Sequence, residues 1–202
     1  TVEALVVQFE CSDSEIATPV DGQDNPDLWK NDCVEIFLDL SHQHDLDAAW
    51  MHVLVTANGQ VLDQKGPVSA YFTTGEPGNG DLEFDVEGLR VKTARIDGGW
   101  SAEISVPWAS LGGKPDDLTI WGFNLARENH PGDEYQTLFP TRGPFFRIDR
   151  WGHLALTPKA ASEEQIAATV KAQHEALIAH RIEVERDKAR YDAHRNSPEQ
   201  SW

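Results

Sequence analysis

The sequence is poor in basic residues. Its 202 residues include 17 Lys and Arg against 34 Asp and Glu, which gives a formal net charge of -17. A surface this acidic repels polyanions, and this argues against nucleic acid and anionic lipid as partners. The chain also lacks any apolar run near the roughly 20 residues that a membrane-spanning helix needs. We therefore expect a soluble domain with no membrane span and a neutral or cationic ligand.

Cysteine is scarce as well. Only Cys11 and Cys33 are present, and neither has a His or Cys at metal-ligand spacing, so no zinc site is expected. Both fall in expected strands and would form a disulfide if those strands were neighbours, which would favour an oxidising compartment. No signal peptide is evident, and the chain opens on strand-like residues, as a mature or trimmed protein would. We expect export, to the extracellular space, the periplasm or the cell surface.

Motifs of catalysis are missing too. The chain contains no Gly-x-Ser-x-Gly, no P-loop, no dinucleotide-binding glycine fingerprint and no His-Glu-x-x-His. A pair of carboxylates suited to glycoside hydrolysis would escape this search, because its members meet only in space. With 34 acidic residues a chance pair is nearly guaranteed, so their abundance carries no weight. The sequence favours a protein that is not an enzyme.

Short strands bounded by turn residues fill the chain from residue 1 to about 157. Asn58-Gly59 is a strong hairpin signal, and Gly98-Gly99 marks a second hairpin. Turn residues recur every eight to twelve positions or so, and no helical period separates the strands. This rhythm predicts an all-β, two-sheet antiparallel β-sandwich over residues 1–157. The strands are expected at residues 4–11, 32–40, 49–57, 60–64, 91–96, 100–106, 120–127 and 152–156.

Residues 158–202 have a different character. Ser162 to Gln165 is a capping box, in which a hydroxyl and an amide each satisfy a free N–H of the first helical turn. No Gly or Pro follows until after His194, so we expect a long C-terminal α-helix. An exposed helix of this length needs a partner. It either packs on its own sandwich, which we favour, or assembles with a second copy or another protein.

Four segments carry a family resemblance, and within them Trp-x-x-Asp-x-Val-Glu-Ile-Phe-x-Asp and Gly-Trp-x-x-Glu-Ile-x-Val-Pro-Trp are the most specific motifs. The segments are residues 28–39, 52–59, 99–108 and 121–127. In this order they resemble the family 9 carbohydrate-binding modules of the DOMON-like superfamily. Trp151-Gly152-His153-Leu154 is similar to the family's final strand. The resemblance covers residues 1–157 and does not extend to the helical tail.

The resemblance implies a non-catalytic sandwich in which two aromatic side chains enclose a sugar while charged and amide groups fix its hydroxyls. By motif, Trp29 takes the first aromatic position and Glu35 the carboxylate that accepts sugar hydroxyls. Arg127 follows the family's Phe-Asn-x-x-Arg pattern and would donate to sugar oxygens. The chain departs from the family at the second aromatic, where Phe139 is the nearest match. The other motif tryptophans are interpreted as packing residues.

The family also suggests a structural calcium ion, for which Asp13, Asp21, Asp39 and Asp63 are hard-oxygen candidates near loops. No EF-hand spacing accompanies them. The superfamily includes haem-binding domains with an axial Met. The single methionine, Met51, is followed by a histidine that must point to the opposite face of its strand.

The sequence therefore predicts a carbohydrate-binding module, with a poly- or oligosaccharide as partner and a role in polysaccharide breakdown or at the cell exterior. Two alternatives stay open. One is a scaffold or interaction domain that assembles through its C-terminal helix and has no sugar site. The other, a minor one, is a haem-binding electron-transfer domain in which Met51 pairs with a distant histidine such as His153.

Overall fold

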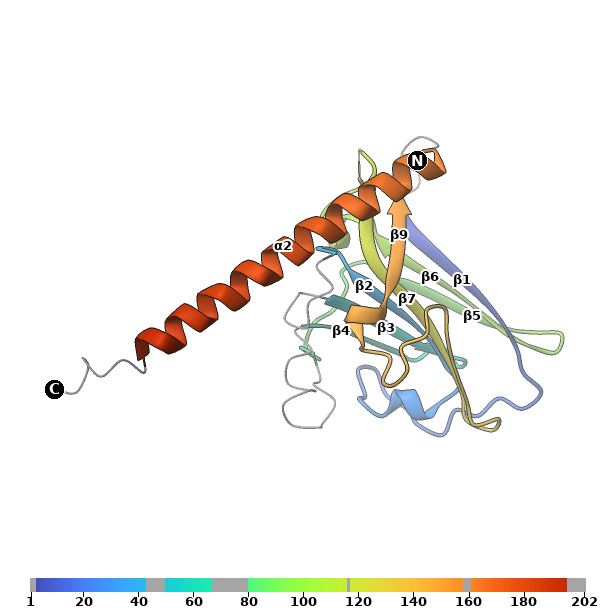
Figure 1. Ribbon diagram of the computed structural model, residues 1–202. Helices are drawn as coiled ribbons and strands as arrows, with labels where there is room; N and C mark the ends of the chain where they lie inside the picture. Colours follow the sequence, from blue (N-terminus) through green and yellow to red (C-terminus); the bar gives the residue numbers. More distant parts are fainter. Residues whose placement is uncertain (1–2, 43–49, 67–79, 116, 158–160, 196–202) are drawn as a thin grey trace. The chain divides into compact units, whose positions relative to one another are not determined.

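The structure is a computed structural model that describes residues 3–42, 50–66, 80–115, 117–157 and 161–195. The chain forms two compact units, Thr1–Pro158 and Lys159–Trp202. The first consists of two antiparallel sheets and the second of one helix (Figure 1). This confirms the all-β sandwich with a C-terminal α-helix that the sequence predicted.

The smaller sheet has three strands in the order β1-β6-β5. They are β1 (Ala4–Ser12), β5 (Arg90–Ile96) and β6 (Gly99–Pro107). The hairpin between β5 and β6 turns at Gly98, whose φ of 74° suits glycine. A side chain at Gly99 is excluded, because its Cβ would collide with the carbonyl of Cys11 on β1. The two glycines thus make the expected hairpin and let β6 lie close to β1.

The larger sheet has six strands, five of them in the order β4-β3-β2-β7-β8. Strand β7 is long enough to pair with β8 near its C-terminal end and with β9 near its N-terminal end. The strands are β2 (Cys33–Asp39), β3 (Trp50–Thr56), β4 (Val61–Gly66), β7 (Thr119–Asn129), β8 (Glu134–Thr137) and β9 (Gly152–Leu156). β8 is the one strand in the described residues that the sequence pattern did not indicate.

Three short 3-10 helices punctuate the sandwich. They are η1 (Leu28–Lys30), η2 (Trp108–Leu111) and η3 (Ile148–Arg150). η1 precedes β2 and η3 precedes β9. Leu28 of η1 and Ile148 of η3 are buried in apolar clusters with residues of the larger sheet.

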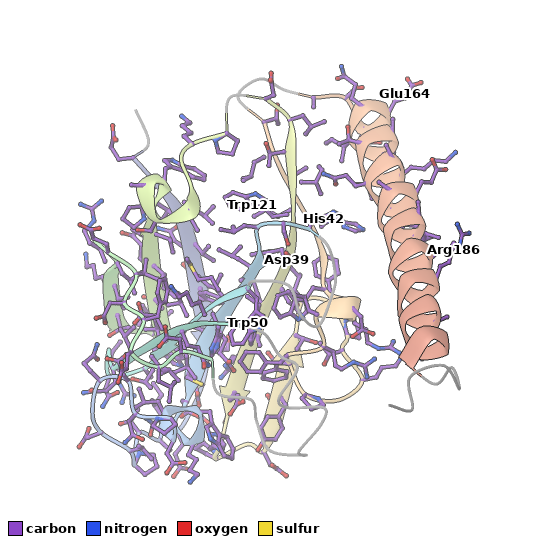
Figure 2. All side chains as sticks on the ribbon, turned by 90° about the vertical axis from the view of Figure 1, so that its left-hand side faces the viewer. Asp39, His42, Trp50, Trp121, Glu164 and Arg186 are labelled. Atoms are coloured by element: carbon purple, nitrogen blue, oxygen red, sulfur yellow. The ribbon has the colours of Figure 1, made fainter. Side chains whose placement is uncertain are left out.

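Successive side chains of the larger sheet point to its two opposite faces, and both faces are buried. Val34, Ile36 and Leu38 of β2 point into the core between the sheets, together with Trp100 and Trp121. The intervening residues point to the outer face, where loops and 3-10 helices cover two further apolar clusters. One contains Phe37, Trp50, Ala126, Ile148 and Trp151, and the other Leu28, Cys33, Leu54 and Leu62. Trp50 and Trp121 thus lie on opposite faces of this sheet (Figure 2).

The expected disulfide is not formed, because Cys11 and Cys33 are both free. β1 and β2 belong to different sheets, and the two side chains lie in different layers. Cys11 points into the core between the sheets, whereas Cys33 points to the outer face of the larger sheet. Burial raises the pKa of both thiols, so at neutral pH they are uncharged packing residues.

The second unit is α2 (Glu163–Arg195). Its capping box is formed as expected, since the Gln165 backbone N–H donates to Ser162 Oγ at 3.2 Å and the Ser162 N–H donates to Gln165 Oε1 at 2.9 Å. Ile178 and Ile182 are exposed on this helix. Assembly through α2 stays a prediction. Among the described residues, no helix has the length and apolarity required to cross a lipid bilayer.

Candidate functional site

A cleft of about 350 Å³ opens on the outer face of the larger sheet, between the two outer apolar clusters. Its floor consists of alternate residues of four adjacent strands, and its walls come from loops. The floor residues are Glu35, His52, Leu54, Leu62, Gln64 and Glu128. The wall residues are Pro26, Trp29, Leu82, Pro144, Phe145 and Phe146.

Strand register brings the polar floor residues together. Gln64 of β4 lies directly opposite His52 of β3. Glu35 of β2 is paired with Leu54 on one side and with Ala126 on the other, so His52 and Glu128 are its diagonal neighbours on the same face. Four polar side chains from four strands thus share one small, largely buried surface.

A chain of hydrogen bonds orients Glu35. The Gly80 N–H donates to Gln64 Oε1 at 2.9 Å, so the Gln64 amide nitrogen is the donor to His52 Nδ1, also at 2.9 Å. His52 must then carry its proton on Nε2, which donates to Glu35 Oε2 at 2.6 Å. The His52 ring is held flat against Phe37, with centroids 4.5 Å apart and an angle of 12°.

Only one oxygen of Glu35 is engaged in this way. Glu35 is 3% exposed, and its Oε1 has no hydrogen-bond partner among the described residues. An unsatisfied carboxylate oxygen in a buried position costs about 1–3 kcal/mol or more relative to a bonded one. A ligand hydroxyl or ammonium that donates to Oε1 would recover this energy, so the oxygen is a ready acceptor at the cleft floor.

Glu128 is the second floor carboxyl. Burial, and after it the negative charge of Glu35, raise the pKa of Glu128 to about 9. Its nearest donor is His130, whose Nε2 is shared between Glu128 Oε2 at 3.1 Å and the Trp29 carbonyl at 2.6 Å. At neutral pH Glu128 therefore keeps its proton, and the floor does not carry two carboxylate charges.

Trp29 stands at the rim because η1 buries its neighbour. Leu28 is fully buried, whereas the Trp29 side chain is 43% exposed. The two residues that follow η1 fasten this turn to the sandwich. Asn31 exchanges two hydrogen bonds with the backbone of Val20, and Asp32 accepts from the His130 N–H at 2.8 Å. The motif Trp-Lys-Asn-Asp thus presents one indole on a rigid base.

The aromatic wall comes from the loop before η3. Phe146 makes edge contacts with Phe37, Trp50 and His52, at centroid distances of 4.9 to 5.1 Å. Phe145 is held through its carbonyl, which accepts a hydrogen bond from Trp151 Nε1 at 2.8 Å. Phe145 and Phe146 are each partly exposed, so ring surface remains available to the cleft.

Of the four residues expected to bind, the structure brings Trp29 and Glu35 to the cleft and places Arg127 elsewhere. Arg127 is one residue from Glu128 on β7 and so points to the opposite face, into the sandwich. Its Nη2 donates to the Ser12 carbonyl and to Asp13 Oδ2, both at 3.0 Å. Arg127 therefore ties the two sheets together, and the expectation that it shares the cleft with Trp29 is corrected.

Phe139 also lies outside the cleft. Its backbone N–H and carbonyl are both bonded to the side chain of Asn124, at 3.0 and 3.1 Å. Its ring lies on Gly152, where any Cβ atom would collide with it. Phe139 therefore packs against the core between the sheets. Phe145 and Phe146 are the phenylalanines that line the cleft.

Sequence reasoning missed the other polar and aromatic side chains of the cleft. They are His52, Gln64, Glu128, Phe145 and Phe146. A signal existed for the first three, because polar residues that interrupt otherwise apolar strands need a partner when both faces of the sheet are buried. The Pro-Phe-Phe run just before the last strand was a signal for the aromatic wall.

The four aspartates suggested for calcium do not gather at one point. Asp13 is paired with Arg127, and Asp39 accepts from the Ser41 N–H and hydroxyl at 3.1 and 2.6 Å. Asp63 instead lies beside two residues that the sequence did not indicate, Asp24 and Asp85, with carboxylate oxygens within 4.8 Å of one another. Burial, and to a smaller extent nearby negative charge, raise the pKa of Asp24 and of Asp63.

The residues considered for haem have other contacts. Met51 packs in the core between the sheets, and His52 points to the outer face, as strand alternation requires. His153 Nδ1 lies 2.6 Å from His42 Nε2. Met51 is thus one of the residues that fill the core.

Comparison with known proteins gave the following results. A family model described as carbohydrate family 9 binding domain-like matches residues 3–137, a span that runs from β1 to the end of β8. No curated protein matched.

Solved structures with this fold include two of a carbohydrate binding module family 9 from Caldicellulosiruptor kristjanssonii, one in complex with cellotriose and one with glucose. Both are 20% identical to this chain with a TM-score of 0.56, and the match covers 80% of this chain and 73% or 74% of theirs. A protein from Bacteroides uniformis is 16% identical, with a TM-score of 0.51 and coverage of 75% and 70%.

Proposed function

Because this chain belongs to the carbohydrate family 9 binding domain-like family, we propose that its outer-face cleft binds carbohydrate. One observation carries the proposal: an exposed indole stands over a floor with a buried, unsatisfied carboxylate oxygen. That combination suits a sugar, which has apolar C–H faces and a rim of hydroxyl donors. The solved relatives with cellotriose and with glucose support the same class of ligand.

Each part of the cleft has a task in this binding. Trp29 offers a flat apolar face to the C–H face of a sugar ring, and Phe145 lines the cleft with a second aromatic surface. Glu35 Oε1 accepts a hydroxyl, while Oε2 is held by His52 and keeps the carboxylate in one orientation. Protonated Glu128 donates to a sugar oxygen. The rigid floor lowers the entropy cost of ordering these groups on binding.

We propose binding without turnover. Glu35 and Glu128 lie side by side on one floor, on the same face of the sheet. Glycoside hydrolysis instead requires two carboxyl groups that flank the scissile bond, one to protonate the leaving oxygen and one on the other side of the sugar ring. The two carboxyl groups of this cleft would both contact a ligand from the same side. A role in polysaccharide breakdown and a location outside the cytoplasm or at the cell surface stay predictions.

Isothermal titration tests this proposal. Glucose and cellotriose should each bind saturably at one site, and cellotriose recovered after overnight incubation should be intact. An absence of binding by both sugars, at protein concentrations high enough to detect millimolar dissociation constants, would remove carbohydrate recognition from this cleft. Release of glucose or cellobiose would overturn the claim that the domain is non-catalytic.

We further propose that Asp24, Asp63 and Asp85 hold a structural calcium ion. Three carboxylates supply the hard oxygen ligands that Ca²⁺ prefers, and a divalent cation would offset the repulsion among their negative charges. Calcium at about 100 times its dissociation constant should stabilise the domain by about 2.7 kcal/mol. Thermal melts with calcium and with a chelator should therefore differ by several degrees, and Asp63→Asn should abolish the difference. Equal melting temperatures for the native chain would contradict the proposal.

A further inference from the structure

The charged groups of the cleft are all acidic. Glu35 and Glu128 lie on the floor, and the residues that line the cleft include neither Lys nor Arg. Arg127, the nearest base along β7, is turned into the sandwich and paired with Asp13. The sequences of residues 43–49 and 67–79 contain no Lys or Arg either. The lining of the cleft therefore has two carboxyl groups and, within the described residues, no lysine or arginine to balance them; His130, which contacts Glu128 Oε2 at 3.1 Å, lies outside this lining.

The two carboxyl groups are buried. Glu35 and Glu128 are 3% and 6% exposed, and neighbouring leucines keep water from much of the floor. His52 is fixed as a neutral donor by the Gly80–Gln64 chain, so it supplies one hydrogen bond and no positive charge. Glu35 Oε1 is left unbonded. A buried carboxylate in this state is strongly stabilised by a cation that donates hydrogen bonds to it.

The two carboxyl groups also do not both ionise at neutral pH. Burial and the charge of Glu35 keep a proton on Glu128 at neutral pH. A ligand cation placed between the two carboxyls would replace that proton. Aromatic surface completes the surroundings, since Trp29, Phe145 and Phe146 line the same cleft and the faces of aromatic rings attract cations.

We propose that the preferred ligand is an amino sugar, whose protonated amino group sits between Glu35 and Glu128 while its ring stacks on Trp29. This inference rests on the proposed carbohydrate-binding function and narrows it to sugars with a free, charged amine, such as oligosaccharides of glucosamine. A neutral sugar satisfies Glu35 Oε1 with a hydroxyl but leaves the floor without a counter-charge. An N-acetylated sugar keeps the nitrogen and loses its charge.

The test compares three trisaccharides of equal length by titration at pH 6, where an amine is protonated. They are the β-1,4 trimers of glucosamine, of N-acetylglucosamine and of glucose. The glucosamine trimer should bind at least tenfold more tightly than either neutral trimer. This preference should persist in about 0.5 M salt, because buried pairs are screened less than surface pairs.

Variants that replace a floor glutamate with neutral glutamine identify the source of this preference for the glucosamine trimer. Glu128→Gln and Glu35→Gln should each reduce the ratio of glucosamine-trimer to glucose-trimer affinity to about threefold or less. Glu103→Gln on β6 makes the same carboxyl-to-amide change at an exposed position on the other sheet, and it should leave the ratio unchanged. Circular dichroism and thermal melts establish whether each variant is folded. If only one of the two floor variants folds, that variant alone suffices for the test.

The outcomes distinguish a failure of the amino-sugar inference from a failure of the proposed carbohydrate binding. Equal or tighter binding of a neutral trimer overturns the amino-sugar inference and leaves carbohydrate binding in place. No binding of any trimer overturns both. A preference that falls equally in Glu103→Gln and Glu128→Gln assigns it to the overall net charge of the protein, and this also overturns the inference.

Discussion

Trp29→Ala should weaken carbohydrate binding by about 30-fold or more, which corresponds to about 2 kcal/mol. Trp29 is the large aromatic side chain at the rim of the cleft and is 43% exposed, with Lys30 Nζ 5.6 Å from its ring centroid. Its truncation removes apolar contact on one side of the sugar and leaves the hydrogen-bonding floor intact. Titration with the best-binding trisaccharide measures the loss.

Two controls define what this result means. Trp29→Phe keeps a smaller aromatic plane, so its affinity should fall between the native chain and the alanine variant. Val6→Ala trims a side chain of similar exposure on β1 of the other sheet, and it should have no effect on binding. The melting temperature of Trp29→Ala should stay within a few degrees of the native value, because Leu28, Asn31 and Asp32 anchor η1. Native affinity in Trp29→Ala would exclude the indole from the site.

Arg127→Met should destabilise the sandwich by about 3–5 kcal/mol and leave carbohydrate affinity unchanged. The Arg127 guanidinium bonds Asp13, whose side chain is 3% exposed, and the carbonyl of Ser12 on the opposite sheet. Methionine fills similar space but leaves the Asp13 carboxylate buried without its counter-charge. Urea denaturation measures the free energy of unfolding, and titration of the folded variant measures binding.

The double variant Arg127→Met/Asp13→Asn separates loss of the ion pair from loss of packing. It removes the buried charge along with its partner, so it should recover most of the lost stability. Loss of affinity in fully folded Arg127→Met would return Arg127 to the binding site. A destabilisation below about 1 kcal/mol would show that the pair behaves like an exposed one.

Arg127 and Glu128 illustrate why motif matching assigned one of them to the cleft and missed the other. They are adjacent on β7, and a strand sends consecutive side chains to opposite faces. The motif placed both residues on one strand but did not show to which face of the sheet each side chain points. On the neighbouring strand, Glu35 shares a face with Cys33 and Phe37, and pairing between β2 and β7 then places Glu128 beside it. Register, which the sequence alone does not reveal, decided which of the two side chains lines the cleft.

Phe139 is a second residue whose position could not be predicted from the sequence. The expected second aromatic was sought by its place before the last strand, and several aromatic residues meet that description. Asn124 bonds both backbone groups of Phe139 and draws it onto Gly152, which leaves Phe145 and Phe146 to continue over the floor. The choice among these rings depends on the path of one loop, and such paths follow from contacts distant in the sequence.

The sequence by itself determined the β-sandwich, most of its strands and the capped C-terminal helix. These follow from local causes: alternation of apolar residues, glycine turns and a capping box. Only the tertiary structure decided that the cysteines stay apart, that Arg127 joins the sheets, and that Glu35 and Glu128 share one floor. Those outcomes depend on which strands pair and in which register, and hence on contacts between residues far apart in the chain.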